Sequence, residues 1–132
     1  MRNFRDYDIW KEGMQISKAV YLLTRDFPDH EKFGIVSQIQ RAVISIPSNI
    51  AEGASRNSEV DFARFLEIAT GSAFEVETQL ILANDLGYIN SDSTNEILIN
   101  INSLEKKLNT LITKIRNNHR KPKSQQPTAN SQ

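Results

Sequence analysis

The sequence predicts an all-α protein that folds as an antiparallel four-helix bundle with up-down-up-down connections. Apolar residues recur at steps of three and four along four long segments, which places them on one face of each helix. The connections between these segments are short, so consecutive helices are expected to be antiparallel neighbours. The 132 residues include five glycines and four prolines and show no strand-like alternation. A chain of this length is expected to form one domain.

The first helix is predicted from Asp8, a good N-cap residue, to about Arg25. One face of this helix carries the spaced positions Ile9, Gly13, Ile16, Val20, Leu23 and Phe27. A second apolar stripe lies beside this face and consists of Trp10, Met14 and Tyr21. Phe65, in a later helix, is expected to add to the same spare apolar surface. The apolar surface is therefore wider than packing inside one bundle requires, which predicts contacts between subunits.

Residues 33–56, FGIVSQIQRAVISIPSNIAEGASR, organise the rest of the chain and predict the second helix. Its apolar face comprises Val36, Ile39, Val43, Ile46 and Ile50. Pro47 removes a backbone donor, so a kink or a break is expected there, and Gly53 is expected to end the helix.

The opposite face of the second helix is a polar stripe made of Gln38, Arg41, Ser45, Ser48 and Glu52. A face that contacts only water usually carries more long charged side chains than this stripe does. Two interpretations therefore stay open: the stripe faces water, or it faces another chain or a ligand. Arg41 shares the face of Glu52, and Arg64 lies near Glu67. Ion pairs within or between subunits are expected for both arginines. The stripe residues and Arg64 are the candidate subunit-interface residues.

Ser58 is predicted to cap a third helix that ends at Leu86, with Gly87 as the C-cap. Its core positions are Phe62, Leu66, Ala69, Ala73, Val76, Leu80 and Ala83. A fourth helix is expected to start near Asp92 or Ser93. Its heptad-like positions are Ile97, Ile101, Leu104, Leu108, Leu111 and Ile115.

The pattern of the fourth helix stops after Asn117, and Pro122 and Pro127 interrupt the polar sequence that follows. Residues 1–116 are therefore predicted to form the bundle, and residues 117–132 are predicted to be a disordered basic and polar tail.

The formal net charge of zero hides an asymmetry. Residues 1–105 hold 9 Lys or Arg against 16 Asp or Glu, whereas residues 106–132 hold 7 Lys or Arg and no acid. Two interpretations stay open, a soluble tail or a basic arm that binds a polyanion such as RNA. The candidate nucleic-acid contacts are the loop residue Arg56 and the C-terminal residues Lys106, Lys107, Lys114, Arg116, Arg120, Lys121 and Lys123. Of the helical ones, Lys107, Lys114 and Arg116 are expected to share a face.

The residue types argue against catalysis, metal binding and a cofactor. The chain has no cysteine, and neither His30 nor His119 has a glutamate three residues before it, as di-metal bundle sites require. No glycine-rich phosphate loop is present. Arg25 and His30 match the Arg-x4-His motif of HEPN-type ribonucleases, but Pro28 between them favours an ordinary turn. The expectation is a non-enzyme without cofactors or an evident small-molecule substrate.

No run of about 18 apolar residues is present, so no membrane-spanning helix is expected. The charged N-terminal residues have no apolar signal-peptide core. These two features predict a cytoplasmic protein.

Three segments together resemble a known family: YDIWKEGMQISKAVYLLTRDFP, the stretch at residues 33–56, and FARFLEIATGSAFEVETQLILANDLGYI. They are similar to bacterial four-helix-bundle proteins encoded in the intervening sequences of 23S ribosomal RNA. The resemblance covers about residues 4–116, and SIPSNIAEG followed by FLEIATGSA is its most specific part. It implies a bundle that assembles into a barrel-like homopentamer.

The same family includes the accessory variability determinant of diversity-generating retroelements. That branch implies binding of nucleic acid and of a reverse transcriptase. Those proteins are strongly basic as a type, whereas residues 1–105 of this chain carry a net charge of −7 from 9 cations and 16 acids. The ribosomal-insert type is therefore favoured, and the expected function is a non-enzymatic, homo-oligomeric RNA-binding or adaptor protein. The alternatives are a retroelement accessory protein and a structural module that binds only proteins.

Overall fold

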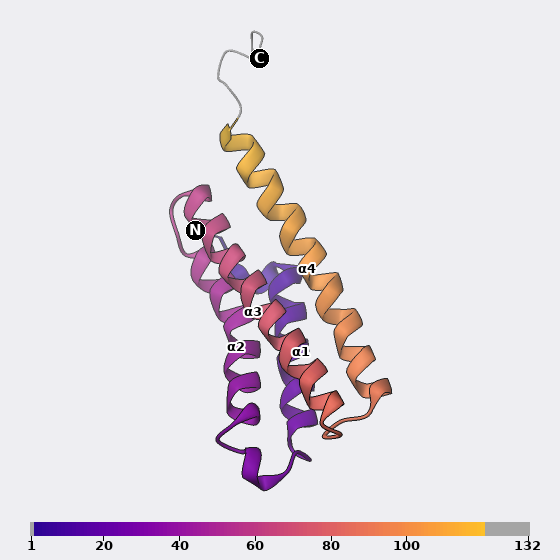
Figure 1. The fold of residues 1–132 in the computed structure, drawn as a ribbon. Coiled ribbons are helices and arrows are strands. Elements are labelled where there is room, and N and C mark those ends of the chain that lie inside the picture. Colours follow the sequence, from indigo (N-terminus) through magenta and orange to yellow (C-terminus); the bar gives the residue numbers. More distant parts are fainter. Residues whose placement is uncertain (1, 121–132) are drawn as a thin grey trace.

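The protein, described by a computed structural model over residues 2–120, consists of four long helices (Figure 1). These are α1 (Asp8–Thr24), α2 (Ile35–Ala54), α3 (Glu59–Asp85) and α4 (Ser91–Arg120). Two short 3-10 helices, η1 (Phe4–Asp6) and η2 (Asp29–Glu31), precede α1 and α2. Over residues 2–120 there is no strand, so the predicted all-α class is confirmed.

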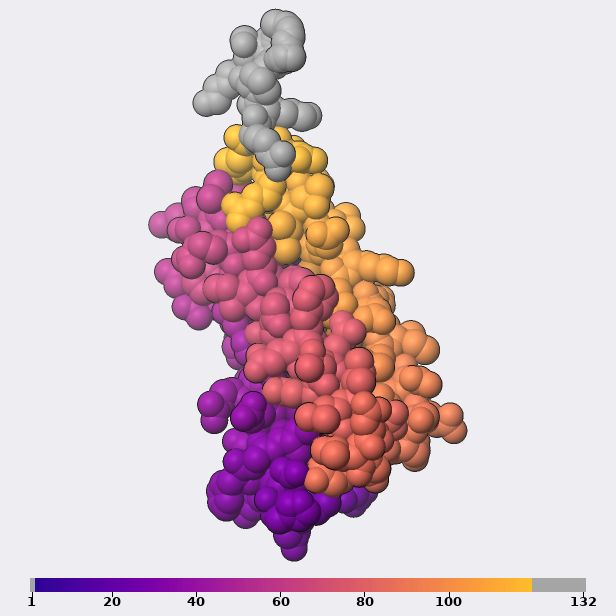
Figure 2. All heavy atoms as spheres, viewed as in Figure 1, coloured from indigo at the N-terminus to yellow at the C-terminus, as the bar shows by residue number. Residues whose placement is uncertain are grey.

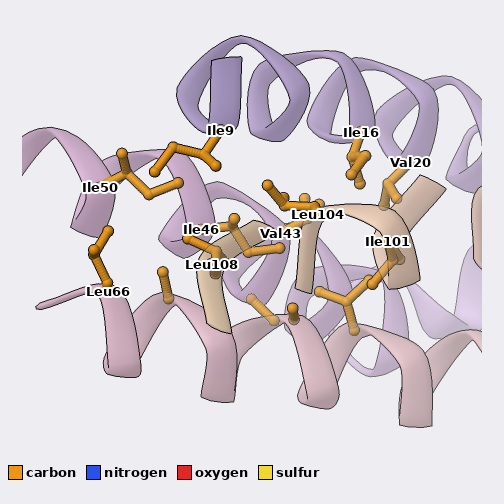
Figure 3. Close-up of a cluster of buried hydrophobic side chains, with 14 of the residues drawn as sticks. Ile9, Ile16, Val20, Val43, Ile46, Ile50, Leu66, Ile101, Leu104 and Leu108 are labelled. Atoms are coloured by element: carbon orange, nitrogen blue, oxygen red, sulfur yellow. The ribbon is translucent and has the colours of Figure 1, made fainter. Parts of the chain in front are cut away.

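The core lies where the apolar faces of all four helices meet (Figure 3). Every predicted core position is buried except three that are half-buried, namely Leu23, Val36 and Leu111. Fully buried branched side chains such as Ile46, Leu80 and Leu104 fill its centre. The steps of three and four in the sequence thus identify the buried face of each helix correctly.

Helix α2 continues through Pro47, so of the kink or break expected there the break is absent. Proline leaves the carbonyl four residues earlier, that of Val43, without its helical donor. The Ser17 hydroxyl of α1 lies 3.2 Å from this carbonyl oxygen and 2.8 Å from the carbonyl oxygen of Gly13, so it can donate to either. A neighbouring helix therefore offers the hydrogen bond that Pro47 removes, which the sequence of α2 alone does not reveal.

Gly53 lies inside the last turn of α2 and does not end the helix as expected. A Cβ atom on Gly53 would lie 2.7 Å from the Phe65 Cβ and 3.1 Å from the Phe62 Cδ1 of α3. The residue is therefore required for the close approach of α2 and α3. Further along the same pair, the hydroxyl oxygens of Ser45 and Ser72 lie 2.8 Å apart.

The ends of α3 agree with the prediction. The Ser58 hydroxyl accepts a hydrogen bond from the Asp61 backbone N–H at 3.0 Å, which is the expected N-cap. Gly87 has a φ of 81°, and the Tyr88 N–H donates to the Ala83 carbonyl at 2.9 Å. This geometry closes the helix at its C-terminus, where only glycine adopts a positive φ without strain.

The ends of α1 and α4 differ in detail from the prediction. Asp8 is the first residue of α1 and not its cap, because Tyr7 holds the N-cap position without a side-chain hydrogen bond. Helix α4 starts at Ser91, because the Asn90 side chain accepts from the Ser93 N–H at 2.8 Å. The helix reaches Arg120, beyond the predicted boundary at residue 116, and residues 121–132 of the predicted tail lie outside the described residues. Among the helices described, none combines the length and the apolar character needed to cross a membrane.

Candidate nucleic-acid interface

The C-terminal turns of α4 extend beyond the neighbouring helices (Figure 1). Helix α4 as a whole carries five of the eight predicted RNA contacts, namely Lys106, Lys107, Lys114, Arg116 and Arg120. Lys106 and Lys114 are exposed and form no ion pair with any residue that the structure describes. The side chain of Arg120 and all of Lys121 and Lys123 lie outside the described part of the chain. These two lysines are therefore the predicted contacts of α4 that have no ion-pair partner among the described side chains.

Two other predicted contacts on α4 are engaged with acids of the bundle. Lys107 pairs with Glu12 of α1, and this hydrogen bond raises the pKa of the lysine. Arg116 Nη2 lies 2.9 Å from Glu67 Oε1 of α3. Because α1 and α3 flank α4 on different sides, Lys107 and Arg116 do not share a face, and that expectation is wrong.

Arg56, predicted to be free in its loop, is held against the α2–α3 corner. Its Nη2 lies 2.9 Å from Glu52 Oε2, and its guanidinium lies 4.7 Å from the centre of the Phe65 ring. Arg64 stacks on the same ring at 4.8 Å, and its Nε lies 3.8 Å from Asp61 Oδ1. Arg64 therefore pairs with Asp61 and not with Glu67, the partner suggested by the sequence. Phe65 is buried, so it does not contribute the spare apolar surface expected of it.

A further cation, Arg2, strengthens this corner. Its Nη1 donates to the Arg56 carbonyl at 2.7 Å, and its Nη2 pairs with Glu59. The guanidinium also lies 4.6 Å from the centre of the Phe62 ring, on which Tyr7 stacks. The N-terminal segment is thus tied to the start of α3, and the cations of this corner stabilise the fold through carboxylates and rings.

The polar stripe of α2 lies on the surface as predicted. Gln38, Arg41, Ser48 and Glu52 are exposed, while Ser45 is half-buried by its contact with Ser72. Arg41 forms no ion pair within residues 2–120, and Glu52, about three turns further along α2, pairs with Arg56. The stripe borders a hollow of about 320 Å³ between α2 and α3, lined by Phe33, Ser37, Gln38, Arg41, Ala42, Ser45, Ser72 and Glu75.

A second hollow, of about 520 Å³, lies between α1 and α2 and was not predicted from the sequence. Its lining residues are Tyr21, Thr24, Arg25, Lys32, Phe33, Val36, Ser37, Gln40, Arg41 and Ile44. The only sequence signal for it was the pair Lys32-Phe33 directly before a helix. Arg25, the residue after α1, and Arg41 of α2 lie on the same hollow, and only the fold brings them together.

The residues of the Arg-x4-His motif form an ordinary turn. The His30 side chain is 73% exposed, and its Nε2 lies 3.9 Å from Glu31 Oε2. Glu31 accepts a hydrogen bond from the Tyr88 hydroxyl at 2.7 Å, which lowers the pKa of the carboxyl group and ties η2 to the α3–α4 connection. Across residues 2–120, no group of three or more His, Cys, Asp or Glu side chains is arranged to hold a metal ion.

One acidic pair lies in the interface between α3 and α4. Glu105 Oε1 accepts a hydrogen bond from the Asn102 amide at 3.2 Å, while its buried Oε2 has no donor among the described residues. Burial, and after it a hydrogen bond with Glu77, raises the pKa of Glu105 to about 8. The folded state therefore favours the protonated form of Glu105 more than the unfolded chain does.

Two comparisons relate this chain to known proteins. A family model described as "23S rRNA-intervening sequence protein" matches residues 5–110. A crystal structure from Bacteroides thetaiotaomicron, of a protein of unknown function from the S23 ribosomal protein family, superposes with a TM-score of 0.72 at 27% sequence identity. The match covers 79% of this chain and 97% of that one. No curated protein matches the chain significantly.

Proposed function

The chain belongs to the family of 23S rRNA-intervening sequence proteins, and from this we propose that it is a non-enzymatic, homo-oligomeric protein that binds RNA in the cytoplasm. The observation that carries the proposal is the C-terminal half of α4. Lys106 and Lys114 are exposed there without a carboxylate partner among the described residues, and no acid follows Glu105 in the sequence. Such an arm neutralises phosphates without reading bases, so the binding has little sequence preference.

We further propose that antiparallel bundles assemble into a barrel-like homopentamer through the outer face of α3. Figure 2 shows α3 side chains spread across the middle of one face of the molecule. Exposed apolar side chains on this helix include Ile68, Phe74, Ile81 and Leu82. A Cβ atom on Gly71 would meet nothing within 4 Å, so a second helix can approach closely there. A helix that is apolar on both faces is typical of one buried on both. The number five rests on the family resemblance.

The test is RNA binding by the full chain, by a chain lacking residues 121–132, and by a Lys106→Gln/Lys114→Gln double variant. A fluorescently labelled single-stranded RNA is titrated at two salt concentrations. We expect both changes to weaken binding and to reduce the salt slope by roughly 0.7 for each phosphate that the protein no longer neutralises. A Lys11→Gln/Lys18→Gln variant removes two exposed lysines of α1 and serves as the control.

Equal binding by all four proteins at low salt would contradict the role of α4. If no RNA binding were detected at all, the chain would instead be an adaptor for a protein, such as the reverse transcriptase bound by its retroelement relatives.

A further inference from the structure

We propose that the hollow between the C-terminal turn of α1 and the first turns of α2 binds a single-stranded segment of nucleic acid, with phosphates on its cations and unpaired bases on its exposed rings. This end of the bundle lies opposite to the C-terminus of α4 (Figure 1). The inference shares with the proposed function only the class of ligand, and the two sites can fail separately.

The first argument is that the positive charges of the hollow have no carboxylate partners among the described residues. Arg25, Lys32 and Arg41 line the hollow, and no carboxylate lines it. None of these three cations forms an ion pair with a residue in the described range. In contrast, the bundle's other end has five cations with carboxylate partners, namely Arg2, Arg56, Arg64, Lys107 and Arg116. A concave surface with one sign of charge attracts ligands of the opposite sign.

Two of the acids closest in sequence, Glu31 and Asp26, are directed elsewhere. Glu31 is bonded to Tyr88 and to the Ile35 N–H. Asp26 lines a different hollow, beside Tyr88. Glu75 of α3 borders the neighbouring hollow, which Arg41 also lines, without coming within ion-pair distance of the arginine. Among the described residues, no carboxylate therefore comes within ion-pair distance of the three cations.

The second argument is the exposure of two aromatic rings at the same hollow. Phe33 is 90% exposed, the most of any large apolar residue described, and Tyr21 on α1 is 38% exposed. Lys32 Nζ lies 5.6 Å from the centre of the Phe33 ring, so a cation and a stacking surface sit side by side. Aromatic rings beside cations are the usual means of binding single strands, because a base stacks on the ring while its phosphate meets the charge.

Polar groups complete the lining and suit the edges of an unpaired base. The Gln40 amide nitrogen donates to the Thr24 hydroxyl at 3.1 Å, which fixes the orientation of this side chain. Gln40 and Ser37 both line the same hollow. A volume of about 520 Å³ lies within the range typical of small-ligand sites. The charge of the lining favours a polyanion over a protein segment as the occupant.

The experiment titrates the full chain with a labelled eight-nucleotide oligouridylate and with an RNA duplex, using fluorescence anisotropy. We expect Phe33→Ala to weaken single-strand binding by about 5- to 150-fold, the range for removal of one base stack, and to change duplex binding little. Phe33→Trp should retain affinity, and Phe33→Leu, which keeps apolar area but has no ring, should not. Arg41→Gln should weaken binding to both RNAs.

Two variants control for the removal of exposed apolar area and of charge. Ile99→Ala removes an exposed apolar side chain from α4, and Lys18→Gln removes an exposed cation from α1. Single-strand affinities of Phe33→Ala and Arg41→Gln within twofold of these controls would overturn the inference. The same substitution is also tested in a chain without residues 121–132. A loss of affinity on Phe33→Ala in that chain would support this site even if the lysines of α4 proved not to bind RNA.

Discussion

At the scale of single residues, Ser17 and Pro47 form a pair across two helices. Proline inside a helix ordinarily costs about 3 kcal/mol or more, partly because one carbonyl loses its donor. Here the Ser17 hydroxyl lies within hydrogen-bond distance of that carbonyl, on Val43. The hydroxyl has one proton to share between Val43 and Gly13, so the compensation is partial.

This pairing predicts a coupling between two substitutions. Ser17→Ala should lower the free energy of unfolding by about 1–2 kcal/mol, because it leaves a buried carbonyl without a donor. In a Pro47→Ala background, the restored N–H of residue 47 can serve Val43, so the same change should cost less. Urea unfolding of the four proteins measures the coupling. Equal costs of Ser17→Ala in both backgrounds would mean that the hydroxyl does not serve Val43.

A second residue-scale prediction concerns pH. The pKa of Glu105 is about 8 in the folded chain, against an ordinary value of 4.5. Between these two values the folded state retains a proton that the unfolded state has lost, so this group makes stability fall as the pH rises from about 4.5 to about 8. Glu105→Gln should remove that component. The measurement is the urea midpoint of both proteins at several pH values, with the exposed Glu96→Gln as a control. Parallel pH profiles for the wild type and Glu105→Gln would contradict the prediction.

At the scale of helices, stability is expected to follow the buried faces. Leu80 is fully buried in α3, whereas Leu22 on α1 is 57% exposed. Leu80→Ala should cost about 2–4 kcal/mol because it leaves a cavity in a packed core. Leu22→Ala should cost less than about 0.5 kcal/mol. Denaturation midpoints of the two variants provide the comparison, and an unchanged midpoint for Leu80→Ala would mean that the core of α3 lies elsewhere.

The helices and their buried faces could be predicted because they depend on local spacing and local caps. Ser58 and Gly87 act within a few residues of their own positions, and both predictions are confirmed. Pro47 and Gly53 were misinterpreted because their effects depend on another helix, α1 for the proline and α3 for the glycine.

The surface charges were harder to predict for the same reason. Lys107 and its partner Glu12 are 95 residues apart in the sequence. Arg116 and Glu67 are 49 residues apart. The order of cations along the chain does not show which of them the fold pairs with acids, so the sequence could name candidate RNA contacts but could not separate paired from unpaired ones. The hollow at Phe33 was missed because its lining comes from two helices.

At the scale of the whole molecule, the outer face of α3 predicts assembly. Light scattering at micromolar concentration should give a mass five times the 15.0 kDa of one chain. Phe74→Asp should reduce this mass, because it places a charge in a proposed apolar contact. Ile99→Asp, at an exposed position of α4, is the matched control. A monomeric wild type would refute the assembly, and an unchanged mass for Phe74→Asp would exclude this face.

The close contact of α2 with α3 at Gly53 also affects the order in which the helices fold and unfold. These two helices share the most extensive packing of the bundle, and only a short turn connects them, so little chain entropy is lost in joining them. Helices α1 and α4 meet less closely, and a hollow of about 530 Å³ lies between them. We therefore expect the α2–α3 hairpin to form early in folding and to open last. In native-state hydrogen exchange, its central amides should be the slowest to exchange, and those facing the α1–α4 hollow should be faster.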